Sequence, residues 1–96
     1  MANLLEKQIE RSVCDYAKSI GFLVYKFTSP ERAAVPDRMF ITPKGKVFFC
    51  EFKREGAKVT PAQAREHERL RAQGVTVFVV DSVEKGRTAV KFQSVL

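Results

Sequence analysis

The sequence predicts a small α/β domain, in which helices flank a mixed central sheet and the elements follow the order α-β-β-β-α-β. Three observations indicate this fold. Apolar residues recur at a helical period over the first twenty positions, three segments rich in aromatic and β-branched residues follow, and a second helical segment precedes a valine-rich run. Because 96 residues are no more than one ordinary domain, we expect residues 1–96 to fold as a single unit.

The first expected element is a helix over residues 4–20. At about 100° per residue, its apolar side chains fall in one stripe: Leu5, Ile9, Val13, Tyr16 and Ile20. Gly21 ends this helix, because glycine tolerates the left-handed conformation that is common at helix C-termini. Residues 22–28 are rich in aromatic and β-branched types and predict a strand, whereas residues 29–36 contain two prolines and predict a loop.

A β-hairpin is expected next. Its strands are residues 37–42 and 46–53, and its turn is Pro43-Lys44-Gly45. With two or three residues in the turn, paired residue numbers sum to 89 or 88, so Asp37 faces either Phe52 or Glu51. Opposed residues on such a ladder have Cβ atoms about 4.5–5.5 Å apart. Since side chains alternate between faces, Glu51 and Lys53 share one face. The hairpin therefore brings two acids and a lysine to one point of the sheet.

The last third of the chain predicts a helix followed by two strands. Thr60, Pro61 and Gln63 are a helix start signal that combines a capping box with proline at the first helical position. This helix runs to about residue 73. The apolar run at residues 75–80 is typical of a strand buried on both faces, and weak alternation at residues 88–93 predicts a short edge strand.

The charge balance favours a polyanionic partner. Lys and Arg number 17 against 11 Asp and Glu, which gives a net charge of +6, and basic side chains that neutralise phosphates release condensed counterions. Lys7, Arg11 and Lys18 share one face of the first helix, and Lys26 lies on the next strand. These four are the candidate DNA-binding residues; the alternative is a solvated basic face without a ligand.

The composition also indicates where the protein works. The longest apolar run, residues 77–80, is far shorter than the ~20 residues that span a bilayer. The first ten residues carry charges in place of the apolar run of an export signal. Cys14 and Cys50 are too few for a disulfide framework or zinc knuckle. We therefore expect a cytoplasmic protein with no membrane partner.

Asp37, Glu51 and Lys53 predict a site for a hard divalent cation. Two unpaired carboxylates at close range repel, and a cation that binds both removes the conflict. Oxygen ligands favour Mg²⁺ or Mn²⁺ over zinc. Glu51 lies within the apolar run of residues 47–50, where a charge is costly unless something binds it. The alternative is an exposed ion pair on a strand and a routine aspartate after proline.

These motifs resemble a known nuclease family. Pro36-Asp37 and Glu51-Phe52-Lys53, with an acid on the preceding helix, are similar to the PD-(D/E)XK nuclease superfamily, and most closely to its virus-type replication-repair branch, VRR-NUC. The resemblance covers nearly the whole chain. It includes the helix ending in Gly21, Lys26, Val35-Pro36-Asp37-Arg38, Thr60-Pro61-Ala62-Gln63 and Leu70 through Gly74. One departure is Ala34, where members usually carry glycine, which bears on the conformation of that loop.

The resemblance implies a set of site residues. Asp37 and Glu51 would bind the metal, together with the backbone carbonyl of Phe52. Lys53 would be the catalytic lysine. Gln63 matches a glutamine that many members place beside the site, although its capping box explains it equally well. The helix acid falls on Glu10, acting directly or through a water, with Glu6 as the alternative if the register slips by one turn.

The resemblance further implies a metal-dependent, structure-specific DNA endonuclease. The expected substrate is branched DNA such as a Holliday junction, cut by a homodimer with two sites, and the expected setting is a bacterial or phage-infected cell. No organic cofactor is expected. Two alternatives stay open: a non-catalytic nucleic-acid-binding module, and the nuclease subunit of a larger replication or repair assembly.

Three other residues are interpreted as structural. His67 is the single histidine and has no second histidine or cysteine pair at ligand spacing, so we expect a partly buried packing residue and no zinc site. Arg38 follows Asp37 on the strand and therefore points to the opposite face, where a structural or subunit contact is expected. Cys50 points away from Glu51 and is interpreted as a packing residue.

Overall fold

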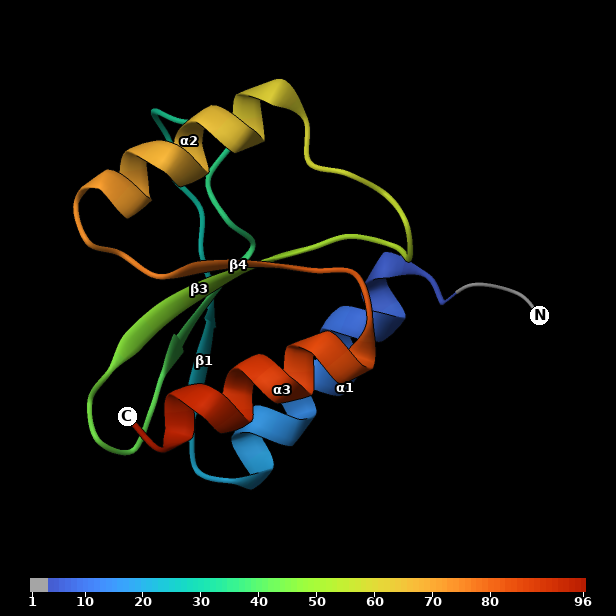
Figure 1. The fold of residues 1–96 in the computed structure, drawn as a ribbon, viewed down its shortest axis with the longest axis vertical. Helices are drawn as coiled ribbons and strands as arrows, with labels where there is room; N and C mark the ends of the chain where they lie inside the picture. Colours follow the sequence, from blue (N-terminus) through green and yellow to red (C-terminus); the bar gives the residue numbers. More distant parts are fainter. Residues whose placement is uncertain (1–3) are drawn as a thin grey trace.

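The computed structural model describes residues 4–96, which form a three-layer α/β domain. Its elements are α1 (Glu6–Ser19), β1 (Leu23–Lys26), β2 (Arg38–Ile41), β3 (Val47–Phe52), α2 (Pro61–Ala72), β4 (Val77–Val80) and α3 (Val83–Ser94). Helices α1 and α3 cover one face of the sheet, and α2 covers the other (Figure 1). The predicted order α-β-β-β-α-β and the mixed sheet flanked by helices are confirmed, with a third helix added at the end.

The sheet has the strand order β1-β2-β3-β4, in which only β3 and β4 run parallel. Arg38 pairs with Cys50, so paired residue numbers across the hairpin sum to 88. This register follows from a three-residue turn that Gly45 permits with a φ of 84°. Continued by one residue, the register places Asp37 opposite Glu51, which confirms one of the two predicted alternatives.

The hydrophobic core lies between the sheet and the α1–α3 layer. Alternate residues of β3 point into it, and Phe48 and Phe52 are fully buried there. Phe40 of β2 stacks on Phe48 with ring centroids 5.0 Å apart. From α1, Ile9 and Val13 pack into the same cluster. The opposite face of β3, which carries Glu51, is therefore left for α2 to cover.

The predicted edge strand at residues 88–93 is wrong, because this segment is part of α3. Ser82 caps the helix, and its hydroxyl accepts a hydrogen bond from the Lys85 N–H at 3.1 Å. The buried residues recur every three or four positions: Gly86, Ala89, Val90 and Gln93. At Gly86 an added Cβ would lie 2.3 Å from a methyl group of Val13, so the absent side chain lets α3 approach α1 closely. Six residues of weak alternation were too few to exclude this helical period.

The strand predicted at residues 75–80 is confirmed as β4, but it is only partly buried. Strand β4 is an outer strand of the sheet, and Val79 is 38% exposed, although Val77 and Val80 are buried. No strand lies beyond β4 among the described residues. Within residues 4–96, no helix has the length and apolar character needed to cross a membrane.

Candidate active site

Asp37 and Glu51 form the centre of the candidate site. Asp37 Oδ2 accepts a hydrogen bond of 2.8 Å from the Phe52 N–H, which holds its carboxylate against the end of β3. Glu51 is 2% exposed. Burial, followed by the charge and the hydrogen bond of Asp37, raises the pKa of Glu51 to about 8. The two side chains would repel each other if both were ionised, and a bound proton or cation would remove this repulsion.

Pro36 leaves the carbonyl of Phe52 without a backbone donor. The register that pairs Arg38 with Cys50 places Pro36 opposite Phe52 when it is continued by two further pairs. Proline has no N–H, so it cannot donate to the Phe52 carbonyl. The Phe52 N–H, in turn, is taken by the Asp37 side chain. The proline before Asp37 thus ends the ladder at the point where a backbone oxygen is expected to serve as a ligand.

Gln63 contacts the site and caps α2 with the same side chain. Its Oε1 accepts a hydrogen bond from the Thr60 N–H at 2.9 Å, and its backbone N–H donates to the Thr60 hydroxyl at 3.1 Å. These bonds complete the predicted capping box. The other end of the amide, Nε2, donates to Glu51 Oε2 at 3.2 Å. The capping role is therefore confirmed, and the contact with Glu51 is compatible with the predicted site role.

His67 differs from the prediction of a partly buried packing residue. It is 1% exposed, and its Nε2 lies 3.7 Å from Glu51 Oε1. Neither atom has a hydrogen-bond partner among the described residues. Because His67 follows Gln63 by one helical turn, both side chains reach the same carboxylate. That i, i+4 spacing behind a site residue is the sequence signal that could have identified His67.

Lys53 directly follows β3 and is half-buried. Its positive charge lowers the pKa of Glu51, but burial and Asp37 have the larger effect and raise that pKa. Its backbone N–H donates to the Val80 carbonyl at 2.9 Å, which ties this residue to β4. Among residues 4–96, no hydrogen bond or ion pair engages its ammonium group. The ammonium is free to meet an anionic ligand.

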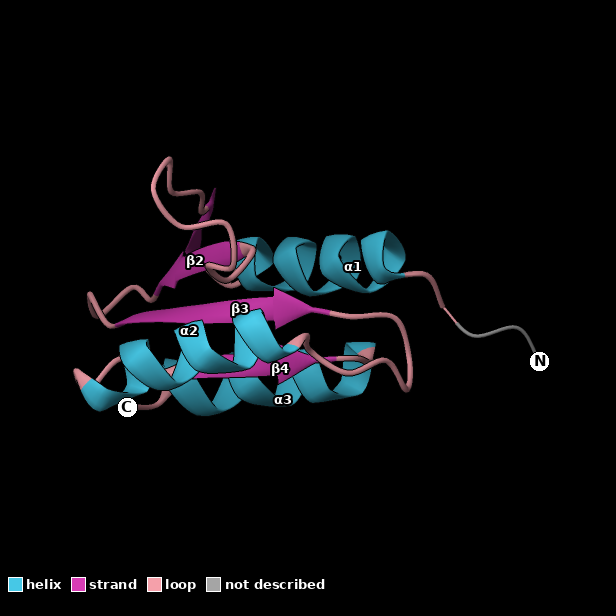
Figure 2. Cartoon of the chain, turned by 90° about the horizontal axis from the view of Figure 1, so that it is seen from above, coloured by secondary structure: helices cyan, strands magenta, loops and turns pink. Residues whose placement is uncertain are grey.

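The structure does not join Glu10 to the carboxylate pair. Its Oε2 accepts a hydrogen bond from Arg38 Nε at 2.6 Å, on the α1 side of the sheet. Arg38 therefore points away from Asp37, as predicted, and has a structural contact within the chain. The charge of Glu6, one turn earlier, contributes to the raised pKa of Glu51. Figure 2 shows that β3 runs alongside α1 and ends toward the helix end where Glu6 lies.

The four predicted DNA-binding residues line one hollow. This hollow of about 520 Å³ lies beside α1, and its basic lining residues are Lys7, Arg11, Lys18, Lys26 and Arg38. Buried Cys14 also lines it, and burial raises the pKa of that thiol to about 11. Arg38 lines this hollow from the α1 side of the sheet, whereas Asp37 and Glu51 lie on the side that α2 covers.

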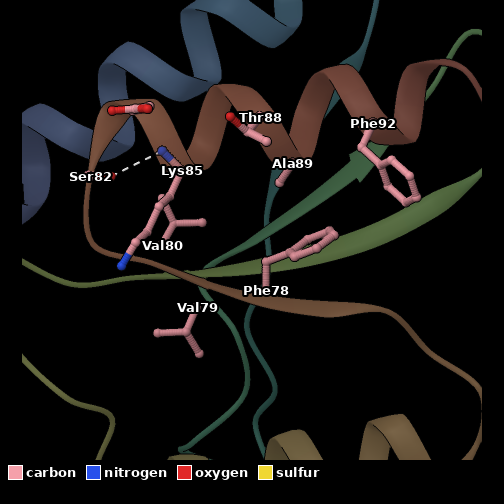
Figure 3. A pocket seen from close by; sticks show the side chains of 9 residues that line it. Phe78, Val79, Val80, Ser82, Lys85, Thr88, Ala89 and Phe92 are labelled. Atoms are coloured by element: carbon pink, nitrogen blue, oxygen red, sulfur yellow. Dashed lines mark hydrogen bonds between the residues drawn. The ribbon is translucent and has the colours of Figure 1, made fainter.

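A second hollow, of about 600 Å³, is apolar and lies between β4 and α3. Figure 3 shows Phe92 of α3 and Phe78 of β4 turned toward one another, with Ala89 beside them. Phe92 is 59% exposed, whereas the Phe78 ring packs edge-on against Phe48 of the core. None of the predicted site residues lines this hollow.

Comparison with known proteins places this chain among nucleases. No family model matches the sequence. The chain is 46% identical over 82 residues to "Putative nuclease p44" of Acyrthosiphon pisum secondary endosymbiont phage 1, covering 85% of this chain and 88% of that protein. A solved structure described as "VRR_NUC domain" superposes with a TM-score of 0.83 at 34% identity, covering 90% of this chain and 94% of that one.

A second solved structure, "VRR_NUC domain protein", has the same fold, with a TM-score of 0.77 at 18% identity, and covers 94% of this chain and 88% of its own. The fold and the relatives together define a nuclease. The chain belongs to the VRR-NUC family.

Proposed function

We propose that this protein is a divalent-metal-dependent DNA endonuclease that cuts branched DNA as a homodimer. The observation that carries the proposal is the buried Glu51 carboxylate, whose Oε1 has no hydrogen-bond partner among the described residues and whose neighbour is a second acid, Asp37. A buried carboxylate in that position is unfavourable unless a cation or proton accompanies it.

The residues present fit a hard metal ion. Asp37, Glu51 and the carbonyl of Phe52 are oxygen donors at one edge of the sheet, and Mg²⁺ or Mn²⁺ prefers oxygen ligands with several waters retained. Within residues 4–96, no three His, Cys, Asp or Glu side chains gather as a metal cluster, so the carbonyl and water complete the proposed ligand set. When bound, such an ion supplies Lewis-acid polarisation of a phosphate oxygen and acidifies water.

The chain's own residues supply orientation and charge. Gln63 Nε2 holds Oε2 of Glu51, which fixes the plane of that carboxylate. The free ammonium of Lys53 is placed to neutralise charge that grows on the phosphate during hydrolysis. Glu6 fits the role of helix acid better than Glu10, since Arg38 occupies Glu10 and the charge of Glu6 reaches Glu51.

The basic hollow supports DNA as the substrate. Five basic side chains and two acidic ones, Glu10 and Asp15, line this depression, which leaves an excess of three positive charges, and the net charge of +6 also favours a polyanion. Arg38 of this hollow lies on the α1 side of the sheet and the carboxylates lie on the α2 side, so the hollow is a candidate DNA-binding surface apart from the carboxylate pair. The phage source of the 46%-identical relative supports a setting in a phage-infected bacterial cell.

The apolar hollow supports the proposed homodimer. It lies along outer strand β4, and its rim includes the exposed Phe92. An outer strand and an apolar helix face are surfaces that a second copy can cover by twofold symmetry. A four-way junction requires paired cuts, which two sites in one particle provide.

The test is cleavage of a labelled four-way junction and a matched linear duplex in Mg²⁺, Mn²⁺ or EDTA. We expect metal-dependent cuts in the junction, a weaker reaction on the duplex, and no cleavage by Asp37→Asn. Equal cutting of both substrates would refute the branch preference. Metal-independent binding without cleavage under every condition would favour a non-catalytic binding module.

A further inference from the structure

We infer that His67 is a positioning residue that holds the Glu51 carboxylate from α2, as the second half of a two-point clamp with Gln63. The inference rests on the proposed metal site and deepens it. Gln63 Nε2 donates to Oε2 of Glu51 at 3.2 Å, and His67 Nε2 lies 3.7 Å from Oε1 of the same carboxylate. Side chains of α2 thus lie next to both carboxylate oxygens of Glu51, the proposed metal ligand.

Burial argues against a packing role alone. The side chains of His67 and Glu51 are 1% and 3% exposed, so water does not satisfy them. Buried polar atoms in folded proteins are nearly always hydrogen-bonded. These two unpartnered atoms, His67 Nε2 and Glu51 Oε1, face each other just beyond bonding distance. A shift of a few tenths of an ångström would bring the pair close to the 2.7–3.2 Å range typical of N–H···O bonds.

The geometry favours a proton on Nε2 of His67. This nitrogen lies 3.7 Å from Glu51 Oε1, and the burial of both side chains excludes water as another partner. A neutral imidazole has one N–H donor, and the tautomer with the proton on Nε2 directs it at the Glu51 carboxylate.

The consequence is a Glu51 side chain that Gln63 and His67 hold at both of its oxygens. Gln63 is itself held in place by the hydrogen bond that its Oε1 accepts from the Thr60 N–H. Hydrogen bonds from outer residues orient metal-binding carboxylates, and their loss typically weakens metal affinity by about 10–100-fold. His67 therefore acts through Glu51 and does not touch the substrate.

The experiment compares two variants in the full-length protein. His67→Phe keeps a ring of similar size and removes the donor, whereas His67→Gln places an amide N–H near the position of Nε2. We expect His67→Phe to weaken Mn²⁺ binding by about 10–100-fold in isothermal titration calorimetry. His67→Gln should restore most of the affinity, and the KM for DNA should stay unchanged in both.

A second measurement uses the wild-type protein alone. Because the chain has one histidine, a ¹⁵N spectrum of the untagged protein reports His67 directly, and the expected signal in Mg²⁺ is the neutral ring protonated on Nε2. A ring protonated on Nδ1 in the presence of Mg²⁺, or unchanged Mn²⁺ affinity in a folded His67→Phe variant, would overturn the inference. If the wild type bound no Mn²⁺ at all, the proposed function itself would fail.

Discussion

Gln63 binds Glu51 with one end of an amide whose other end caps its own helix. The Thr60 N–H fixes Oε1 at 2.9 Å, so Nε2 can only point toward Glu51 Oε2, 3.2 Å away. A motif that begins α2 therefore also orients a carboxylate of the candidate metal site. Because one side chain both caps α2 and binds Glu51, this small domain needs no further helix or strand to orient the carboxylate.

Substitutions of Lys53 and of Glu51 should impair different properties of the protein. Because the Lys53 ammonium acts on the phosphate, Lys53→Met should lower kcat by about 10²–10³-fold while Mn²⁺ binding persists. Glu51→Gln should abolish both cleavage and tight Mn²⁺ binding. Junction cleavage rates and calorimetric Mn²⁺ titrations separate the two. Lys58→Met, an exposed lysine on the following loop, is the matched control and should behave as wild type. Loss of metal binding in Lys53→Met would contradict this division of roles.

The metal-free protein should lose stability as the pH rises from about 4.5 toward 8. The unfolded chain releases the Glu51 proton near 4.5, whereas the folded protein retains it until about 8. Over that window the unfolded state is increasingly favoured, and the loss levels off above it. Urea denaturation in EDTA at several pH values measures this effect. The difference in the free energy of unfolding between wild type and Glu51→Gln separates the effect of Glu51 from that of His67. The lowered pKa of His67 makes the folded protein more stable as the pH rises through the range between its folded and unfolded pKa values.

The same proton should compete with the metal. Mn²⁺ affinity is expected to increase with pH up to about 8 and then become constant, since the cation must displace the proton on Glu51. Calorimetry in buffers of different ionisation enthalpy counts the protons released. A pH-independent affinity, with no proton released at pH 6.5, would show that Glu51 is already ionised in the metal-free protein.

The basic hollow should govern DNA affinity through salt-dependent contacts. Replacing both Arg11 and Lys26 with alanine is expected to weaken DNA binding and to reduce the slope of log K against log salt by about one unit for each lost phosphate contact. Fluorescence anisotropy over a salt series measures both quantities. Lys44→Ala, at the hairpin turn far from Asp37 along β2, controls for net charge. An equal effect of Lys44→Ala would indicate nonspecific attraction only.

The face formed by β4 and α3 should determine the oligomeric state. Light scattering of the wild type is expected to give twice the chain mass of 10.9 kDa, and Phe92→Glu should give a monomer because a charge at a covered apolar surface is unfavourable. Leu23→Glu introduces the same charge at another exposed apolar residue, on β1, and should leave the dimer intact. A monomeric wild type, or dissociation by both variants alike, would contradict the assignment of this face.

The parts of the site that the sequence predicted are those set by local geometry. The turn and the alternation of side chains were enough to place Asp37 opposite either Glu51 or Phe52, and the observed register selects Glu51. The helix start signal likewise identified Thr60 and Gln63. These features depend on residues that are close in the chain, so spacing alone carries the information.

The parts that the sequence did not predict depend on packing between distant elements. Arg38 forms an ion pair with Glu10 because α1 crosses the sheet at that point. Helical periodicity in the sequence cannot show where a helix crosses a sheet. The contact of His67 with Glu51 likewise depends on how α2 lies over β3. The third helix was missed because small residues such as Gly86 carry its buried face, and these give a weak apolar pattern.

A crystal structure of the protein soaked in Mn²⁺ tests the central claim most directly. We expect one anomalous peak bounded by Asp37, Glu51 and the Phe52 carbonyl, at the metal–oxygen distances of about 2.0–2.6 Å that hard cations adopt. A crystal that showed no peak there, with the two carboxylates turned apart, would contradict the account.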